Sequence, residues 1–298
     1  MRQPGLGWRL AGDQAPDHGC DAEQPLILDV DATLVGSDDG TRDQPVTPPT
    51  LTLEQLDGIF ERFVVEDWRQ VAESIEGWST VAVVNRRGRQ PSGPLTAEYS
   101  LQVEVADAAA VLREFTTVKT LFGWSYGGLI VLELANTLAI PHVIAYEPVI
   151  HPFGARVLPA LQLAADSEDW DATVEIVTRR IAGMDPEVVD GLRADSGLWV
   201  EMRRLGEPVY AETAALNDAG DSNQLAVKAK RVDLILGSND REESPYGTTF
   251  SDVSAKVAHA EAHDLPGQGH MVHLEAPSAL AALLDQLRSA NEAPRSGD

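Results

Sequence analysis

The residues with the clearest chemical potential lie in the segment Gly123–Gly128, which reads GWSYGG. An apolar run precedes this segment and a second apolar run follows it, so Ser125 is expected on a turn between a strand and a helix. Glycines in such a turn avoid collisions with the neighbouring backbone, and they let the serine hydroxyl stand above the sheet. The following helix N-terminus favours developing negative charge. The pattern therefore predicts Ser125 as a nucleophile flanked by Trp124 and Tyr126, with Trp124 in the substrate pocket.

A serine hydroxyl needs a base to become reactive at neutral pH. His270 ends the stretch GQGH, which follows a late apolar run and precedes the last predicted helix. Asp240 follows the strand-like run LILG by a short turn, at the same expected edge of the sheet. The third residue of such a triad orients the imidazole and stabilises its protonated form. We therefore predict Ser125, Asp240 and His270 as the catalytic residues, with Glu147 as a reserve acid or a pocket-wall carboxylate.

Short β-rich runs alternate with helical stretches along the chain, and this rhythm predicts an α/β fold with a mostly parallel sheet flanked by helices. Several of the runs are almost continuously apolar, as expected for strands buried on both faces. The predicted strands are Leu26–Val30, Thr80–Asn85, Val118–Gly123, His142–Tyr146, Val232–Leu236 and Ala260–Leu265. The predicted helices around them are Glu66–Ile75, Asp107–Phe115, Tyr126–Leu138 and Ser278–Ala290.

The rhythm breaks between residues 151 and 225, where only helical signals follow one another. Asp185 and Pro186, for example, form a good helix start, with an N-cap aspartate before a proline. This stretch predicts a helical insertion that divides a core of residues 1–150 and 226–298. A second irregular zone, from Val35 to Leu51, predicts a long loop rich in Asp, Gly, Thr and Pro, with a helix over Leu53–Phe63 after it.

Composition restricts the classes of partner. Among 298 residues, 23 Lys and Arg stand against 47 Asp and Glu, which gives a net charge of −24. Such a charge repels phosphate backbones and anionic membrane surfaces, so we expect neither nucleic acid nor membrane as a partner. One cysteine, Cys20, excludes a disulfide framework and a multi-cysteine metal site. The absence of an export signal and of a membrane-length apolar run leads us to expect a cytoplasmic protein with a small-molecule substrate.

The order and spacing of these pieces resemble the α/β-hydrolase superfamily over residues from about 24 to 288. The matching segments are Leu26–Leu34, Asn85–Arg89, Gly123–Gly128, Tyr146–Pro148, Leu236–Asp240 and Gly269–Pro277. The resemblance implies a triad of Ser125, Asp240 and His270 under a helical cap formed by the insertion. It also implies an oxyanion hole made by the backbone N–H of Tyr126 and one N–H after Val30. Neither a metal nor an organic cofactor is implied.

The segment after Val30 departs from the family pattern. Relatives usually carry His-Gly there, whereas this chain has Asp31 and Ala32, followed by Thr33. The alignment makes Thr33 the second N–H donor and places Asp31 and Ala32 in the pocket. Because alanine adopts positive φ less readily than glycine, this hole is expected to differ from that of the relatives.

Other readings of the sequence remain open. The run LILDVDATL resembles the first motif of haloacid-dehalogenase-type phosphatases, in which Asp29 would be phosphorylated and Asp31 would act as acid and base. The hydrolase scaffold also serves binding proteins, and the same triad can open epoxides or perform other tailoring steps. The reading that fits best is a serine hydrolase for an ester, thioester, lactone or amide of a partly hydrophobic molecule, in specialised metabolite biosynthesis.

Overall fold

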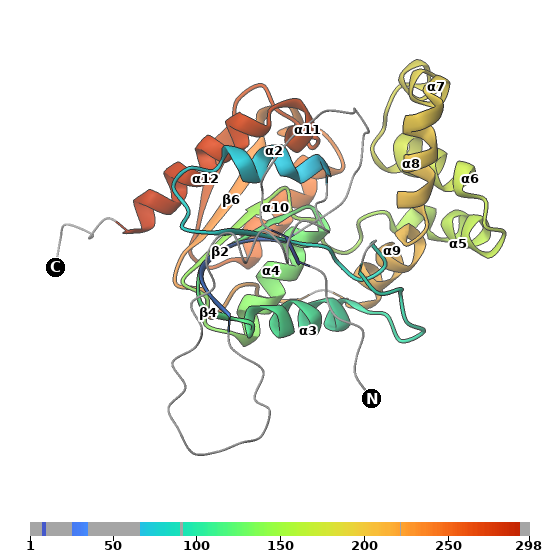
Figure 1. Cartoon of the computed structure of the whole chain (residues 1–298). Coiled ribbons are helices and arrows are strands. Elements are labelled where there is room, and N and C mark those ends of the chain that lie inside the picture. The colour runs from blue at the N-terminus through green and yellow to red at the C-terminus, as the bar shows by residue number, and fades with distance from the viewer. Residues whose placement is uncertain (1–7, 10–25, 35–65, 90–91, 221, 293–298) are drawn as a thin grey trace.

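The computed structural model describes residues 8–9, 26–34, 66–89, 92–220 and 222–292 of the chain. The described strands form one seven-stranded sheet in the order β1-β3-β2-β4-β5-β6-β7, with helices on both of its faces (Figure 1). The strands are β1 (Trp8–Arg9), β2 (Leu26–Leu34), β3 (Val81–Val84), β4 (Phe115–Trp124), β5 (His142–Tyr146), β6 (Val232–Gly237) and β7 (Ala260–Leu265). All six strands predicted from the apolar runs are therefore present.

The centre of the sheet is buried on both faces. Strands β4, β5, β6 and β7 pair in parallel, and every residue of β5 and β6 is buried. Successive side chains of a strand enter opposite cores, so Leu121 packs on one face and Phe122 on the other. Burial on both faces is why these strands are almost continuously apolar in sequence. Their parallel pairing places the carboxyl ends of all four strands at one edge of the sheet.

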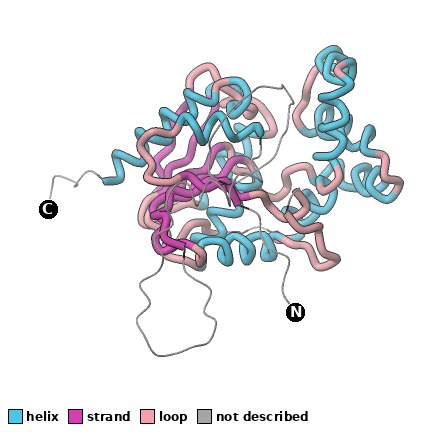
Figure 2. The backbone as a smooth tube through the Cα atoms, viewed as in Figure 1, coloured by secondary structure: helices cyan, strands magenta, loops and turns pink. Residues whose placement is uncertain are grey.

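Six helices of the described core cover the two faces. One face packs against α2 (Glu66–Ser74), α11 (Val272–Glu275) and α12 (Pro277–Glu292), and the other against α3 (Leu101–Leu112), α4 (Tyr126–Thr137) and α10 (Tyr246–Lys256). Helix α3 begins earlier than predicted because the Ser100 side chain caps it by accepting a hydrogen bond from Val103 N–H. Figure 2 shows the strands enclosed between the two helical layers.

Strand β2 is an antiparallel member of the sheet, which the sequence predicted as mostly parallel. Strand β2 runs antiparallel to both β3 and β4, with Leu26 opposite Gly123 and Leu34 opposite Phe115. An apolar run predicts a strand, but its direction depends on pairing with residues far away in sequence. The carboxyl end of β2 therefore lies at the end of the sheet that is remote from Ser125.

Only helices occur in the described chain between β5 and β6. They are η1 (Ala155–Val157), α5 (Leu158–Asp166), α6 (Trp170–Glu175), η2 (Ile176–Ile181), α7 (Pro186–Ala194), α8 (Ser196–Gly206) and α9 (Val209–Asp218). We call this group the helical insertion. It lies to one side of the sheet (Figure 1) and contains two small apolar clusters of its own. The predicted helix start at Asp185 and Pro186 is confirmed, although the Asp185 side chain makes no capping hydrogen bond.

Two further predictions concern other parts of the chain. The loop over Val35–Leu51 and the helix over Leu53–Phe63 lie outside the described residues. Among the helices of the described ranges, none combines the length and the apolar character needed to cross a bilayer.

Candidate active site

Ser125 lies on a sharp turn between β4 and α4. Its backbone has φ 55° and ψ −120°, a conformation that costs a non-glycine residue about 1–3 kcal/mol. The turn is held in place because Ser125 N–H donates to the Tyr146 carbonyl oxygen at 2.9 Å. A Cβ on Gly123 would lie 2.3 Å from the carbonyl oxygen of Gly127, so only glycine fits there. The structure thus gives a steric reason for the GWSYGG spacing.

The carboxylate bonded to His270 is Glu147, and not the predicted Asp240. Glu147 Oε2 lies 2.7 Å from His270 Nδ1, and its side chain is completely buried. The other oxygen, Oε1, accepts a hydrogen bond of 2.8 Å from Gly237 N–H. Glu147 directly follows β5, and its positive φ of 41° is uncommon for a side-chain-bearing residue. The prediction chose the wrong strand end, because a sequence run does not show which of two neighbouring carboxylates reaches the imidazole.

Asp240 lies close to the loop before His270, but in the described chain no hydrogen bond joins its carboxylate to the imidazole. It ends the 3₁₀ turn η3 (Ser238–Asp240), and a Cβ on Gly269 would lie 3.2 Å from its Oδ2. That Oδ2 is buried and has no hydrogen-bond partner within the described part of the chain. Burial, and then the nearby charge of Glu147, raise the pKa of Asp240 to about 6. Asp240 is therefore a neighbour of the Glu147–His270 pair.

Two aromatic rings enclose the imidazole of His270. The Tyr246 ring stacks on it with centroids 3.6 Å apart and an interplanar angle of 12°, and the Trp124 ring stacks at 4.5 Å and 30°. Trp124 Nε1 also donates to the His270 carbonyl oxygen at 2.7 Å, and Tyr146 Oη donates to the Gly269 carbonyl oxygen at 2.7 Å. Rings and hydrogen bonds together fix the position of the imidazole. Neither Tyr246 nor Tyr146 was singled out from the sequence for this role.

Burial controls the protonation of the pair. The aromatic enclosure lowers the pKa of His270 to about 3, which keeps the imidazole neutral. Burial raises the pKa of Glu147 to about 7, against the stabilising hydrogen bond from Gly237 N–H. Since the two groups share one hydrogen bond, they titrate as a pair. When Glu147 is ionised, Nδ1 carries the hydrogen and Nε2 is free to accept a proton.

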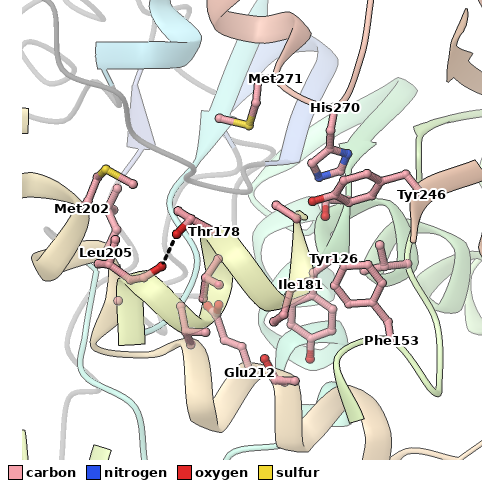
Figure 3. A pocket seen from close by; sticks show the side chains of 18 of the residues that line it. Tyr126, Phe153, Thr178, Ile181, Met202, Leu205, Glu212, Tyr246, His270 and Met271 are labelled. Atoms are coloured by element: carbon pink, nitrogen blue, oxygen red, sulfur yellow. Dashed lines mark hydrogen bonds between the residues drawn. The ribbon is translucent and has the colours of Figure 1, made fainter. Parts of the chain in front are cut away.

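A cavity of about 190 Å³ opens between this edge of the sheet and the helical insertion. Ser125 and His270 both line it, and Figure 3 shows His270 and Tyr246 at one end of it. Most of the wall is apolar and comes from the insertion and from the loops after β4, β5 and β7. The apolar wall residues are Trp124, Val149, Phe153, Val174, Val177, Ile181, Ala182, Met184, Leu192, Met202, Leu205, Val209, Leu216 and Met271.

The structure corrects the prediction for the second oxyanion donor. Tyr126 follows Ser125 at the start of α4, and its backbone N–H stays the predicted first oxyanion donor. Thr33 lies within β2 beyond Asp31, which pairs with Thr117. Thr117 is eight residues before Ser125, or about 26 Å along β4 at about 3.3 Å per residue. Because β2 runs antiparallel, Asp31, Ala32 and Thr33 lie far from the cavity, and the prediction of their roles there is wrong.

The position of β2 also contradicts the phosphatase alternative. Asp29 and Asp31 lie inside β2 and pair with β4 residues, whereas that chemistry needs them where a strand ends. Another acidic cluster, of Asp233, Glu261 and His263, has ligand atoms close enough together to hold a metal ion. However, the Arg231 guanidinium already bonds to Asp233 at 2.7 Å and to Glu261 at 3.3 Å. Arg231 therefore already supplies a positive charge to these two carboxylates.

The chain resembles known proteins in sequence and in fold. A sequence profile described as the alpha/beta hydrolase family matches residues 57–283. Three similar solved structures are an alpha/beta hydrolase from Sphaerobacter thermophilus, a thermophilic esterase from Thermogutta terrifontis and an enol-lactonase from Burkholderia xenovorans. Their identities to this chain are 23%, 16% and 16%, with TM-scores of 0.57, 0.57 and 0.55.

Coverage is similar for all three structures. The matches span 73%, 76% and 75% of this chain and 85%, 86% and 86% of the respective structures. At these identities the likeness establishes the fold alone. No curated protein sequence matches the chain significantly.

Proposed function

Because the chain belongs to the alpha/beta hydrolase family, we propose that it is a serine hydrolase. Its substrate would be an ester, thioester, lactone or amide of a small to medium, partly hydrophobic molecule. One observation carries the proposal: the strained turn presents Ser125 to the same cavity that receives His270, whose Nδ1 is bonded to Glu147 at 2.7 Å. Strain at a single residue and a carboxylate–imidazole pair beside it are the parts that activate a hydroxyl.

In the first half-reaction, His270 Nε2 takes the proton of the Ser125 hydroxyl as the oxygen attacks the substrate carbonyl carbon. Glu147 holds the imidazole in the tautomer that leaves Nε2 free, and it stabilises the imidazolium that forms. The backbone N–H of Tyr126 receives the oxyanion of the tetrahedral intermediate, and the positive end of α4 lies behind it. The imidazolium then gives its proton to the leaving group as the bond to it breaks.

In the second half-reaction, water replaces the leaving group. His270 removes a proton from the water, whose oxygen attacks the acyl carbon, and collapse of the intermediate returns the proton to Ser125. In this account Asp240 modulates the pair and does not orient the imidazole. This assignment replaces the aspartate of the sequence-based triad with Glu147.

The cavity suggests the size of the group that the substrate buries. An apolar cavity of about 150 Å³ holds a benzene ring, so about 190 Å³ fits a medium acyl chain or one substituted ring. The names of two similar structures, an esterase and an enol-lactonase, fit this substrate class. The strong acidity of the chain, with its net charge of −24, is the feature that favours a dedicated biosynthetic enzyme over a broad esterase.

The proposal is tested by a chromogenic ester assay with p-nitrophenyl acyl esters. Wild-type protein should release p-nitrophenol, and Ser125→Ala should lose nearly all of that activity while keeping the melting temperature of the wild type or exceeding it. Equal activity in both proteins would contradict the serine mechanism.

A second use of the same residues is a non-hydrolytic tailoring reaction. Such a reaction needs no second oxyanion donor, and Thr33, which was predicted for that role, lies at the other end of the sheet from Ser125. Reaction in ¹⁸O-labelled water separates the two functions. Label in the released acid indicates hydrolysis, whereas a Ser125-dependent product without label indicates tailoring.

A further inference from the structure

The Tyr246 hydroxyl is a polar group at the end of the cavity where Ser125 and His270 meet. Tyr246 begins α10, is partly exposed and lines the cavity together with those two residues. Within the described residues its Oη makes no hydrogen bond, and it is not one of the fully buried hydroxyls of that part of the chain. Figure 3 shows the hydroxyl oxygen of Tyr246 pointing into the cavity. A ligand in the cavity can therefore reach this hydroxyl.

The position of the hydroxyl follows from the stacking of two rings. The Tyr246 ring lies on the imidazole of His270 with centroids 3.6 Å apart and an interplanar angle of 12°, so the two ring edges are one van der Waals layer apart. Glu147 bonds to Nδ1 at 2.7 Å, which leaves Nε2 for the substrate. In the proposed function Nε2 protonates the leaving group, so the leaving oxygen lies about 3 Å from Nε2. An oxygen at that place is also within reach of Tyr246 Oη, which Figure 3 shows beside the edge of the imidazole that points into the cavity.

The charged part of the cavity wall does not compete for this role. Arg89, from the loop after β3, lines the cavity beside Glu212 of α9 and donates to it at 2.6 Å and 3.2 Å. Arg89 also donates to the Leu205 carbonyl oxygen at 2.9 Å, and Arg86 behind it donates to Glu212 at 2.7 Å. Both charges on the wall are thus already paired, and this part of the cavity suits an uncharged substrate.

Tyr246 keeps its hydrogen during the reaction. Burial, and then the negative charges of Glu147 and Asp240, raise the pKa of Tyr246 above its ordinary value. The phenol therefore donates a hydrogen bond without transferring its proton. His270 remains the acid of the reaction.

We propose that Tyr246 is a further catalytic residue, whose hydroxyl donates a hydrogen bond to the leaving-group oxygen as the bond from that oxygen to the acyl carbon breaks. The electron pair of the broken bond goes to the leaving oxygen, and the proton comes from Nε2 of the His270 imidazolium. The inference rests on the proposed function and narrows its substrates to oxygen esters of alkyl alcohols, either open-chain or lactone.

The narrower class follows from the leaving atom. An ester oxygen has two lone pairs, so one takes the proton from Nε2 while the other accepts the Tyr246 hydrogen bond. The nitrogen that leaves an amide has a single lone pair, which the proton occupies. Sulfur is a weak acceptor, so a thioester gains little from a phenol. An alkoxide is a far stronger base than a thiolate, and an alkyl ester therefore gains most from a second donor.

Three derivatives of one acid test the proposal: ethyl hexanoate, S-ethyl hexanethioate and p-nitrophenyl hexanoate. The readout is kcat/KM, which reports the steps up to the release of the leaving group. Tyr246→Phe should lower kcat/KM for ethyl hexanoate about ten- to a hundredfold, from the range for a hydrogen bond to a group that gains charge. The other two substrates should change less than about threefold, because a thiolate and a nitrophenolate leave without a second donor.

Tyr146→Phe is the matched control, since it removes a hydroxyl from the same region and keeps the ring. Tyr146 Oη donates to the Gly269 carbonyl oxygen at 2.7 Å, so its loss disturbs the loop that carries His270. This disturbance should slow all three substrates by a similar factor. A loss confined to the alkyl ester is a signature that a merely structural role of Tyr246 would not give. Circular dichroism melts should show that both variants fold.

The outcomes separate the role of the hydroxyl from the proposed function. Ser125-dependent hydrolysis in which Tyr246→Phe slows all three substrates equally, or none of them, overturns the role of Tyr246 and leaves the serine hydrolase intact. Wild-type protein that hydrolyses the thioester or the p-nitrophenyl ester but not ethyl hexanoate overturns the narrower substrate class. Hydrolysis of none of the three overturns the proposed function and this inference with it.

Discussion

The exchange of Glu147 for glutamine tests which acid serves His270. Gly237 N–H donates to Glu147 Oε1 at 2.8 Å, so the glutamine oxygen must take that position. The glutamine NH₂ then faces His270 Nδ1, where Oε2 now lies at 2.7 Å. An N–H donor at Nδ1 forces the hydrogen onto Nε2, and that tautomer cannot accept a proton from Ser125. Loss of the correct tautomer costs about 10⁴-fold in kcat in a comparable triad.

We therefore expect Glu147→Gln to lower kcat for a p-nitrophenyl ester about 10³- to 10⁴-fold, with little change in KM. Asp240→Asn is the comparison variant, because the Asp240 carboxylate interacts with Glu147 and with the His270 backbone N–H, whereas Glu147 bonds to the imidazole itself. This variant should keep kcat within about tenfold of the wild type, since it removes a charge near the imidazole but keeps the hydrogen bond to Nδ1, and one pKa unit corresponds to about tenfold. Circular dichroism melts should show that both variants fold. The reverse ranking, with Asp240→Asn the more damaging, would refute the assignment of Glu147.

Three further predictions concern protonation and stability. Because burial raises the pKa of Glu147 to about 7 and only its ionised form frees Nε2, kcat/KM should rise with pH through about 7; a limb near 4 would contradict this. Tyr246→Leu should admit water and raise the pKa of His270 above about 3 in an NMR titration, whereas Tyr246→Phe should not; equal pKa values in the two variants would contradict the stacking argument. Asp233→Asn should lower the free energy of unfolding in urea by about 3–5 kcal/mol, since it leaves Arg231 without its buried partner. The Asp233 pKa lies near 2, below its ordinary value, so its stabilisation is present above about pH 4 and is lost toward pH 2; an unfolding curve that the substitution leaves unchanged would contradict this.

The sequence was sufficient where local sterics determine the structure. The turn at Ser125 needs glycine at position 123 because the Gly127 backbone leaves no room for a Cβ, and that need is visible as a motif. The apolar runs of β4, β5 and β6 are visible for a similar reason, since both of their faces are buried. These features depend on neighbours along the chain or on burial alone.

The sequence was insufficient where contacts between distant segments decide. Glu147 and Asp240 each follow a strand at the same edge, and only the three-dimensional path of the loop before His270 selects Glu147. The direction of β2 likewise depends on its pairing with β3 and β4, so the position of Thr33 was predicted wrongly.

The charged part of the cavity wall gave only a weak signal. Basic residues cluster directly after β3 in an otherwise acidic chain, but their partner Glu212 is 123 residues beyond Arg89. Nothing local to α9 distinguishes this glutamate from a solvated one. Its burial follows from how the helical insertion packs on the core, and whether that insertion acts as a lid stays a prediction.

The central claim is that Ser125 carries an activated hydroxyl, and covalent labelling tests it most directly. Wild-type protein treated with a fluorophosphonate should gain one adduct, which peptide mass spectrometry assigns to Ser125. Ser125→Ala should take up none, and His270→Gln should react at least a hundred times more slowly. Wild-type protein that stays unlabelled, or that reacts equally fast without His270, would contradict the account.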